Sequence, residues 1–323
     1  MVSIKQIATD IGVSAATVSN ALTGKGRVSP EMIERIRSRA AELGYRPSIT
    51  ARALKSGRTG ILGLVMPDLT NPLFPRIAQT LSIAADGHRL GILIADSRGS
   101  ADEQSEALGR LVDRGVDGLL VVPQKGTSPE PQPVPMVVIN TASDPNNSVS
   151  ADHAGGGALV ARHIAELGHR NIVILGGDPI SEVQRDRISG MTAALPDGTN
   201  TTVLWGDEGI SRVPGEIASG ATAVMTTSDL LALSVRSQLM RAGLSVPEDV
   251  SLTGFDDLSF SKSMHPALTT VAQNVEAIAD RAIDLITRMI GGKTQPEAGE
   301  TVPMRLVVRD STSNPKTNQE EMP

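Results

Sequence analysis

The sequence lacks cysteine and has few aromatic residues. Its 323 residues include no Cys, one Trp, one Tyr and three Phe. The absence of cysteine excludes disulfide bonds, thiolate zinc sites and a cysteine nucleophile. No apolar run approaches the roughly 20 residues that a membrane-spanning helix needs, and the N-terminus lacks the apolar core of a secretory signal. We therefore expect a cytoplasmic protein of two or three domains with no membrane partner.

Charge is distributed unevenly along the chain. The whole sequence has a net charge of −6, yet residues 1–60 contain ten Lys and Arg against four acids. This first segment therefore carries +6, and the remainder carries −12. A basic segment on an acidic body favours the binding of a polyanion at one end. A solvated charged face is the alternative that charge alone leaves open.

Residues 3–44 have the pattern of three short helices. Apolar residues recur at helical spacing over Ile4–Ile11, Gly12 can end that helix, and Ser14 can cap the next one. A loop, TGKGR, precedes a third helix that Ser29 can cap. Two helices around a tight turn are typical of a helix-turn-helix, whose second helix enters the major groove of DNA. A helical cap on the body is the alternative, but turn, capping and positive charge together favour DNA.

Longer stretches of the chain carry a more specific signal. In the first quarter this stretch is IKQIATDIGVSAATVSNALTGKGRVSPEMIERIRSRAAELGYRPSITARALKSGRTGILGLVMPDLTNPLF, and in the body the stretches are RGVDGLLVVP, HIAELGHRNIVILGG, AGLSVPEDVSLTGFDD and HPALTTV. They resemble the LacI/GalR family of bacterial transcriptional regulators. The resemblance covers nearly the whole chain except the tail.

The resemblance implies which residues contact DNA. It assigns base-edge positions to Ala15, Ala16 and Asn20, and backbone-contacting positions to Ser14, Thr17, Ser19 and the loop residues Lys25 and Arg27. Alanine can touch a thymine methyl group but cannot donate a hydrogen bond, whereas asparagine suits adenine. The family often has arginine or histidine in place of this asparagine and larger polar residues in place of the first alanine. This departure leaves the operator sequence open.

Residues 48–60, SITARALKSGRTG, contain helix formers but are too short to hold a helix alone in water. Leu54 also has no obvious core to join. The resemblance matches this leucine to the one that family members insert into the minor groove, where apolar side chains kink the duplex. Arg52, Lys55 and Arg58 would then lie beside phosphates. We expect a segment that becomes helical only on the operator, with a simple linker as the alternative.

From Ile61 onward, apolar runs alternate with helical segments. The runs are ILGLV, GILIA, GLLVV, MVVI, NIVIL, TVLW, AVMT and VSLTG. This alternation is typical of parallel sheets built from βαβ units. The predicted fold is α/β: an N-terminal all-α helix-turn-helix head and a two-lobed body with parallel sheets. The resemblance implies a body like that of periplasmic sugar-binding proteins, with a cleft between the lobes.

Ligands of open parallel sheets bind beyond the carboxyl ends of the strands. Polar residues follow the predicted strands at Asp68, Asp96, Asn140, Asp178, Asp207, Ser228, Asp229, Asp256 and Asp257. With one basic group, for which Arg187 is the candidate, these acceptors suit a ligand with many hydroxyl groups. Acids after strands are also common helix N-caps, an alternative that applies equally to Asp178 and Asp229. The resemblance favours a ligand role for Asn140, Arg187 and Asp256, and more weakly for Ser228.

The small number of aromatic residues limits the classes of ligand that we expect. The resemblance places Phe74 where it could stack on a bound ring, and Trp205 stands at the end of a predicted strand. Either side chain could instead belong to a core. A sugar or sugar derivative is therefore favoured over a flat nucleobase. The predicted effector site comprises Asp68, Phe74, Asn140, Arg187, Trp205, Ser228 and Asp256.

Several other kinds of site are not expected. The sequence has no nucleotide-binding glycine motif, no paired-histidine spacing and no nucleophile elbow, so we expect no cofactor, no metal and no enzymatic activity. The polar tail lacks a leucine heptad, which favours a homodimer over a tetramer. The predicted organisation is a DNA-binding domain at 1–47, a hinge at 48–60, an effector-binding and dimerisation domain at 61–310, and a disordered tail at 311–323.

These observations predict a homodimeric regulator of transcription, favoured as a repressor. It would bind a palindromic double-stranded DNA operator under the control of a small polar metabolite in the cleft. A transport-type sugar-binding protein and a regulator that responds to a nucleobase are the alternatives. The sequence does not indicate whether the metabolite releases the protein from DNA or promotes binding.

Overall fold

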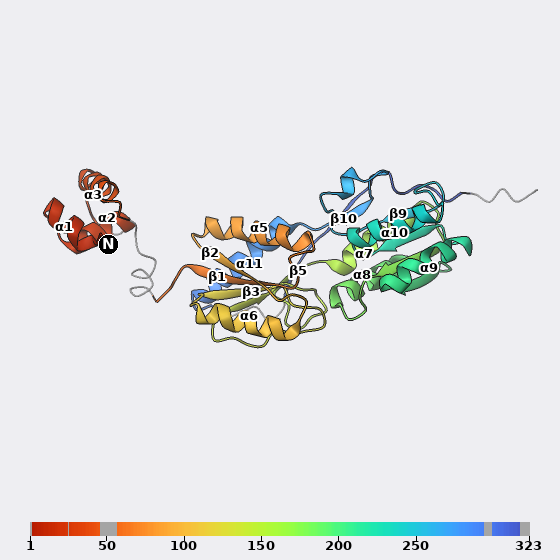
Figure 1. Ribbon diagram of the computed structural model, residues 1–323, viewed down its shortest axis with the longest axis horizontal. Coiled ribbons are helices and arrows are strands. Elements are labelled where there is room, and N and C mark those ends of the chain that lie inside the picture. The colour runs from red at the N-terminus through yellow and green to blue at the C-terminus, as the bar shows by residue number, and fades with distance from the viewer. Residues whose placement is uncertain (1, 25, 46–56, 294–298, 317–323) are drawn as a thin grey trace, which may run out of the picture. The chain divides into compact units, whose positions relative to one another are not determined.

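The computed structural model describes residues 2–24, 26–45, 57–293 and 299–316 (Figure 1). Contacts divide the chain into two compact units, residues 1–59 and 60–323, which we describe separately as the head and the body. Four residues predicted to bind DNA lie outside the described residues: Lys25, Arg52, Leu54 and Lys55.

The head contains the three predicted helices, α1 (Ile4–Ile11), α2 (Ala15–Thr23) and α3 (Pro30–Glu42). Ser14 and Ser29 cap the second and third helices as predicted, each accepting a hydrogen bond from a backbone amide of the first turn. Gly12 has a φ of 77°, a conformation that glycine adopts freely, so it turns the chain between α1 and α2. A small core holds the helices together: Ile7, Ala8, Val18, Ala21, Ile36 and Ala40.

The first lobe of the body, the N-lobe, contains a parallel sheet of strand order β2-β1-β3-β4. Its strands are β1 (Ile61–Met66), β2 (Gly91–Asp96), β3 (Gly118–Val121) and β4 (Met136–Val138). Helices α5 (Leu73–Gly87) and α11 (Val275–Ile290) share a core with one face of this sheet, and α6 (Ala101–Asp113) covers the other (Figure 1). A short pair, β5 (Val149–Ala151) and β11 (Glu300–Val302), completes the lobe.

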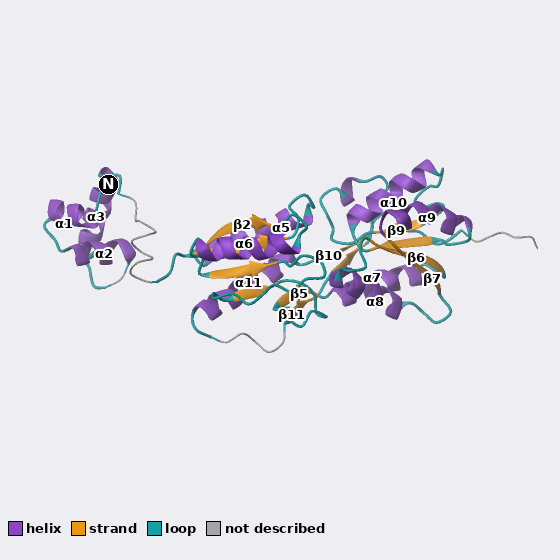
Figure 2. Ribbon diagram, turned by 60° about the horizontal axis from the view of Figure 1, so that its bottom comes forward, coloured by secondary structure: helices purple, strands orange, loops and turns teal. Residues whose placement is uncertain are grey.

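The second lobe, the C-lobe, repeats this architecture with a parallel sheet of order β7-β6-β8-β9. The strands are β6 (Asn171–Gly176), β7 (Asn200–Trp205), β8 (Ala223–Thr226) and β9 (Ser251–Thr253). The helices are α7 (His153–Glu166), α8 (Glu182–Ala194), α9 (Gly206–Ala218) and α10 (Asp229–Arg241), and they lie on both faces of the sheet (Figure 2). β10 (Thr270–Ala272) pairs antiparallel with β12 (Arg305–Val307).

The chain passes between the lobes three times. The crossings are the segments between β5 and α7, between β10 and α11, and between β11 and β12. Each is at most two residues long, namely residue 152, residues 273–274 and residues 303–304. The two-lobed α/β fold predicted from the alternation of strands and helices is therefore confirmed.

Helices α7 and α8 pack unusually closely because glycines face each other. A Cβ atom at Gly157 would collide with the carbonyl oxygen of Arg187, and one at Gly190 would collide with that of Ala154. This close approach brings the first turn of α7 next to the middle of α8, where the polar residues described below converge.

The prediction of a disordered tail from residue 311 is wrong at its start. Ser311 is 1% exposed; its Oγ donates to the carbonyl of Leu252 at 2.6 Å and accepts from the amide of Thr269 at 2.8 Å. β9 is the last strand of its sheet, so its outer edge needs hydrogen-bond partners, and residues 311–313 supply them. Residues 317–323 lie outside the described residues.

Among the described helices, none combines the length and apolar character needed to cross a membrane.

Candidate functional site

Hydrogen bonds between Ser14 and Thr17 hold the start of α2. Ser14 Oγ accepts from the amide of Thr17 at 3.0 Å and lies 2.9 Å from the hydroxyl of the same threonine. Ala16 is exposed, whereas Ala15 is half-buried against the core of the head. Of the two alanines assigned to base edges, the structure therefore exposes Ala16 more fully.

Asn20 lies beside the loop that follows α2. A Cβ atom at Gly26, whose φ is 80°, would stand 3.0 Å from the Nδ2 atom of Asn20. The asparagine thus packs against the loop that also contains Arg27, and Ser19 and Asn20 both take part in interactions within the chain. Base recognition by Asn20 stays a prediction, and the loop contact is an additional role that the sequence did not indicate.

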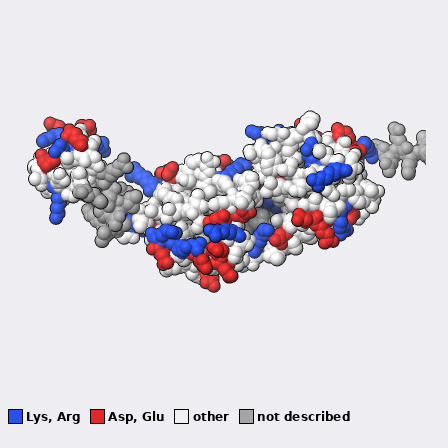
Figure 3. All heavy atoms as spheres, viewed as in Figure 1, with Lys and Arg blue, Asp and Glu red and all other residues white. Residues whose placement is uncertain are grey.

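Part of the positive charge of the head is neutralised within the head. Arg39 on α3 lies 2.7 Å from Asp10 on α1 and 2.9 Å from Glu42. The bond to Asp10 ties the third helix to the first, whereas the bond to Glu42 lies within the third helix. Figure 3 accordingly shows basic and acidic atoms side by side on the visible face of the head.

A cavity of about 710 Å³ lies between the lobes of the body. Six of the seven predicted effector residues line it: Asp68, Phe74, Asn140, Arg187, Ser228 and Asp256. One wall is apolar and comes largely from α5 and α11, with Leu73, Phe74, Ile77, Val275 and Ile278. The wall that the C-lobe supplies is mainly polar, and the N-lobe adds polar residues such as Asp68, Asp96 and Asn140 around its apolar patch. A cavity with an apolar patch among polar groups suits a ligand that has both apolar and polar faces.

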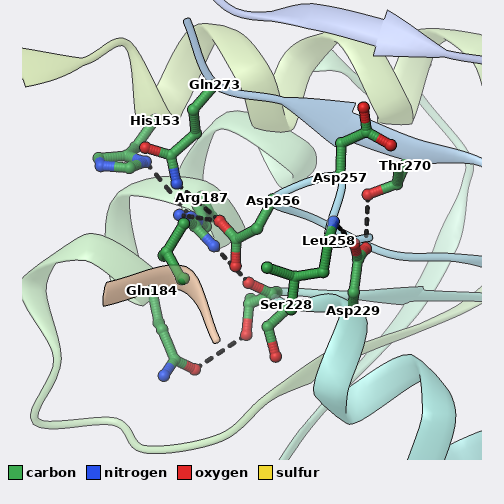
Figure 4. A network of polar contacts seen from close by, with 12 residues as sticks. His153, Gln184, Arg187, Ser228, Asp229, Asp256, Asp257, Leu258, Thr270 and Gln273 are labelled. Carbon is green, nitrogen blue, oxygen red and sulfur yellow. Dashed lines mark hydrogen bonds and ion pairs between the residues drawn. The ribbon is translucent and has the colours of Figure 1, made fainter. Parts of the chain in front are cut away.

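The polar wall centres on a buried ion pair (Figure 4). Arg187 and Asp256 are 3% and 4% exposed, and Nη2 of the arginine lies 2.9 Å from Oδ1 of the aspartate. Gln273 donates to this same Oδ1 at 2.7 Å. Arg187 also donates to the carbonyl of Thr227 at 2.6 Å, and its guanidinium lies 4.0 Å from the centre of the Phe255 ring. Among the described residues none donates to Oδ2 of Asp256, so this oxygen is available to a ligand.

His153 opens α7 beside this pair. It is buried, and its Nδ1 accepts from Nε of Arg187 at 3.3 Å. Burial, and secondarily the positive charge of Arg187, hold the pKa of His153 well below its usual range, against a weaker opposing effect of the Asn140 backbone. The imidazole is therefore neutral. Sequence reasoning missed His153 and Gln273, because each stands in or next to a crossing segment rather than at the end of a long strand.

Asp229 is a buried anchor rather than a cavity residue. Its carboxylate accepts from the amide of Leu258 at 2.7 Å and from the hydroxyls of Ser261 at 2.6 Å and Thr270 at 2.5 Å. Burial raises the pKa of Asp229 to about 6, and the hydrogen bonds only partly offset this effect. The neighbouring Ser228 lines the cavity, but its hydroxyl caps α10 by accepting from Leu231.

Two acids at the strand ends are held by local bonds. Asp68 accepts from the hydroxyl and amide of Thr70 at 2.6 and 2.8 Å, which lowers the pKa of its carboxyl group. Asp178 accepts from the amide of Ile180 and pairs with Lys125 at 3.2 Å, and the pKa of this carboxyl group is also lowered. Because Lys125 belongs to the N-lobe, the second pair bridges the mouth of the cleft.

Trp205 is the predicted effector residue that the structure places elsewhere. It ends β7 opposite Gly176 of β6, and its ring packs over this glycine, which has no side chain to displace it. The ring joins the core under α7 and α8 and is not part of the cavity wall. The prediction for Trp205 is therefore wrong, because the register of an edge strand directs its ring onto the neighbouring strand.

Comparisons with known proteins agree with this architecture. Residues 3–48 match the family described as bacterial regulatory proteins, lacI family, and residues 161–312 match the periplasmic binding protein-like domain. The HTH-type transcriptional regulator MalR of Streptomyces coelicolor is 30% identical over 336 residues, which cover 96% of this chain and 96% of that protein.

Solved structures are similar over most of the chain. The lac repressor dimer bound to operator and the anti-inducer ONPF superposes with a TM-score of 0.83 at 23% identity, covering 97% of this chain and 99% of that one. The complex of the transcriptional regulator CelR with cellobiose gives a TM-score of 0.70 at 27% identity, covering 96% of this chain and 100% of that one. The helix-turn-helix head, the two-lobed body and the identity to MalR together lead to one conclusion: the chain belongs to the LacI family and is a DNA-binding transcriptional regulator with an effector-binding body.

Proposed function

We propose that the protein is a cytoplasmic repressor without enzymatic activity, and that a sugar or sugar derivative in the cleft controls its binding to a palindromic operator. Asp68, Phe74, Asn140, Arg187, Ser228 and Asp256 would contact this effector. The single observation that carries the proposal is the arrangement around Asp256, where one carboxylate oxygen is fixed by Arg187 and Gln273 and the other has no donor among the described residues.

This arrangement is suited to pairs of hydroxyl groups. A hydroxyl can donate to the second oxygen of Asp256, and it can accept from Arg187, of whose roughly five N–H donors only three are engaged by the protein. Phe74 and Ile77 on the opposite wall would cover the apolar face of a sugar ring. The cellobiose bound to CelR, a relative of 27% identity, supports a sugar as the class of effector.

A thermal-shift and gel-shift screen tests the proposal. D-ribose, D-glucose, cellobiose and maltose would be compared with adenine and hypoxanthine, each at a concentration far above the expected Kd, because a ligand of the folded body raises its Tm. The active compound would then be added to the protein on an operator fragment. A response to a sugar that is retained in Asp113→Asn, a change at an exposed position of α6 outside the cavity lining, but lost in Asp256→Asn supports the site. If only a nucleobase produces a response, the proposal of a sugar effector is wrong and the effector is a nucleobase.

For DNA, we propose that the exposed side of α2 and the following loop contact the operator. The residues concerned are Ser14, Ala15, Ala16, Thr17, Ser19, Asn20 and Arg27. Two such heads in a dimer would read two half-sites, so the operator would be a near-palindrome. A gel shift at two salt concentrations checks this, because a sequence-specific complex should persist at higher salt when a random fragment is released.

For dimerisation, we propose the exposed apolar side chains of both lobes. In the N-lobe these are Ile83 on α5 and Leu93 and Ile94 on the edge strand β2, with Ile83 67% and Ile94 49% exposed. In the C-lobe, Leu233 and Met240 lie seven residues apart on α10 and are both exposed. Exposed apolar side chains on a sheet edge and on a neighbouring helix favour pairing with a second copy.

A further inference from the structure

The turn from Phe255 to Leu258 connects the cores of the two lobes. Phe255 is fully buried in the C-lobe core under α7 and α8. Leu258, three residues later, is 3% exposed and belongs to the N-lobe core formed by β1, α5 and α11. Between them, Asp256 lines the cavity. A movement of this turn therefore affects both cores and the ligand site at once.

The two central residues of the turn have a backbone conformation that side chains disfavour. Asp256 has a φ of 101° and Asp257 a φ of 48°. Non-glycine residues persist in this region only where surrounding contacts hold them. Within the C-lobe, Arg309 donates to the carboxylate of Asp257 at 2.6 Å, and Asp229 accepts from the amide of Leu258.

The N-lobe holds the same turn through Arg76 on α5. Nη1 of this arginine donates to the carbonyl oxygen of Asp257 at 3.2 Å and lies 3.5 Å from that of Asp256. Arg76 does not line the cavity, whereas Phe74, in the same helical turn, does. The first turn of α5 thus touches both the ligand space and the backbone of the residue that would bind the ligand.

We infer that Arg76 is a positioning residue that couples occupancy of Asp256 to the position of α5. The inference rests on the proposed function. A ligand hydroxyl bonded to the free oxygen of Asp256 shifts a turn whose conformation is held by its neighbours, and Arg76 transmits this shift to the helix. α5 is continuous to Gly87, so the shift reaches Ile83 on the proposed dimer face. Along the axis of α5, Ile83 lies roughly 10 Å from Arg76, at a rise of about 1.5 Å per residue.

If Arg76 only stabilised the fold, its removal would not change the effect of sugar on operator binding, whereas removal of a coupling residue would. The decisive quantity is the ratio of operator Kd with and without the sugar that gives the largest thermal shift in the screen above. For Arg76→Ala we expect this ratio to fall at least about fivefold, a loss within the usual range of allosteric coupling. Operator binding without sugar should stay within about threefold of wild type, and Arg76→Lys should recover part of the ratio because its ammonium group can still donate to one carbonyl.

The matched control is Arg162→Ala, which removes the same charge from an exposed position on α7. A second measurement needs no sugar. Hydrogen exchange of the amides of residues 257–261 should be at least about fivefold faster in Arg76→Ala and unchanged in Arg162→Ala.

The outcomes distinguish the coupling role of Arg76 from the proposed function. Unchanged exchange in Arg76→Ala, or a wild-type ratio in a variant that still responds to sugar, overturns the inference and leaves the proposed function standing. A wild-type protein whose operator binding responds to no sugar overturns the proposed function, and the coupling role falls with it. Faster exchange together with a reduced ratio supports the inference.

Discussion

The guanidinium of Arg187 and the carboxylate of Asp256 form an ion pair at 2.9 Å, with both side chains almost completely removed from solvent. The partners come from different elements of the C-lobe, α8 and the turn after β9. A buried pair of this kind is costly to break, because the remaining charge has neither water nor a counter-ion. The same pair lies at the centre of the proposed effector site, so stability and ligand recognition are linked there.

Asp256→Asn should therefore destabilise the body as well as abolish the response to sugar. Asparagine keeps the shape and tolerates a positive φ, but it leaves the charge of Arg187 buried and uncompensated. We expect a loss of about 3 kcal/mol in the free energy of unfolding, measured by urea denaturation. Asp68→Asn, a cavity acid that is more exposed, should lose less than about 1 kcal/mol. Equal losses in the two variants would contradict this account.

Asp229 should make the stability of the body depend on pH. Its pKa of about 6 in the folded protein lies above the ordinary aspartate pKa of 3.8, so the folded state prefers the protonated carboxyl group. The resulting stabilisation is complete below about pH 4 and is lost as the pH rises through about 6, with a total of about 3 kcal/mol at about 1.4 kcal/mol per pKa unit.

Asp229→Asn cannot titrate, so it removes this contribution. Urea unfolding from pH 4 to pH 7 should show the wild type losing stability relative to the variant by this amount as the pH rises. A difference between the two proteins that is constant across this range would show that Asp229 ionises in the folded state as readily as in the unfolded state.

Ile94→Asp should convert the dimer to a monomer. A charge on edge strand β2 would have to be buried between two copies, at a cost that an interface of this kind does not tolerate. Sedimentation velocity at micromolar concentration measures the change. Val308→Asp, which introduces the same charge at another exposed apolar residue, should stay dimeric. Loss of the dimer in both variants would point to a general effect of charge.

Leu54→Ala should weaken specific operator binding by about tenfold or more, equivalent to about 1.4 kcal/mol. The leucine would no longer unstack a base step in the minor groove. Binding to random DNA, which depends on the basic residues around it, should change little, and the Tm of the body should be unaffected. Hydrogen exchange of residues 48–58 with and without operator provides the direct readout, since equal protection in both states would make the segment a linker.

Local signals explain which parts of the fold could be predicted. The helices of the head follow from Ser14 and Ser29 as caps and from apolar residues at helical spacing, all within a few positions of each other. The strands follow from short apolar runs such as Ile61–Met66. Ser311 was misjudged because its partners, Leu252 and Thr269, are far away in the sequence and only the finished sheet brings them close.

The proposed effector site could be predicted in part, because the carboxyl ends of the parallel strands lie close together and the residues after them can be read from the sequence. Asp256 and Arg187 were predicted from the set of acceptors after strands with one basic group, together with the family resemblance, and both line the cavity. His153 and Gln273 were not, since a single polar residue at a crossing has no local pattern. Trp205 shows the opposite error: its position at a strand end was correct, but the direction of its ring depends on Gly176 in the neighbouring strand.

The three crossings between the lobes are each one or two residues long, and we expect them to act together as a hinge. Three short connections side by side permit the lobes to swing about one line but resist sliding or independent twisting. Gln273 stands on this line, so its bond to Asp256 should keep nearly the same length however wide the cleft is. Lys125 and Asp178, across the mouth, lie far from the line and should separate by the greatest distance. We therefore expect opening of the cleft to break the ion pair at its mouth and to leave the bond between Gln273 and Asp256 in place.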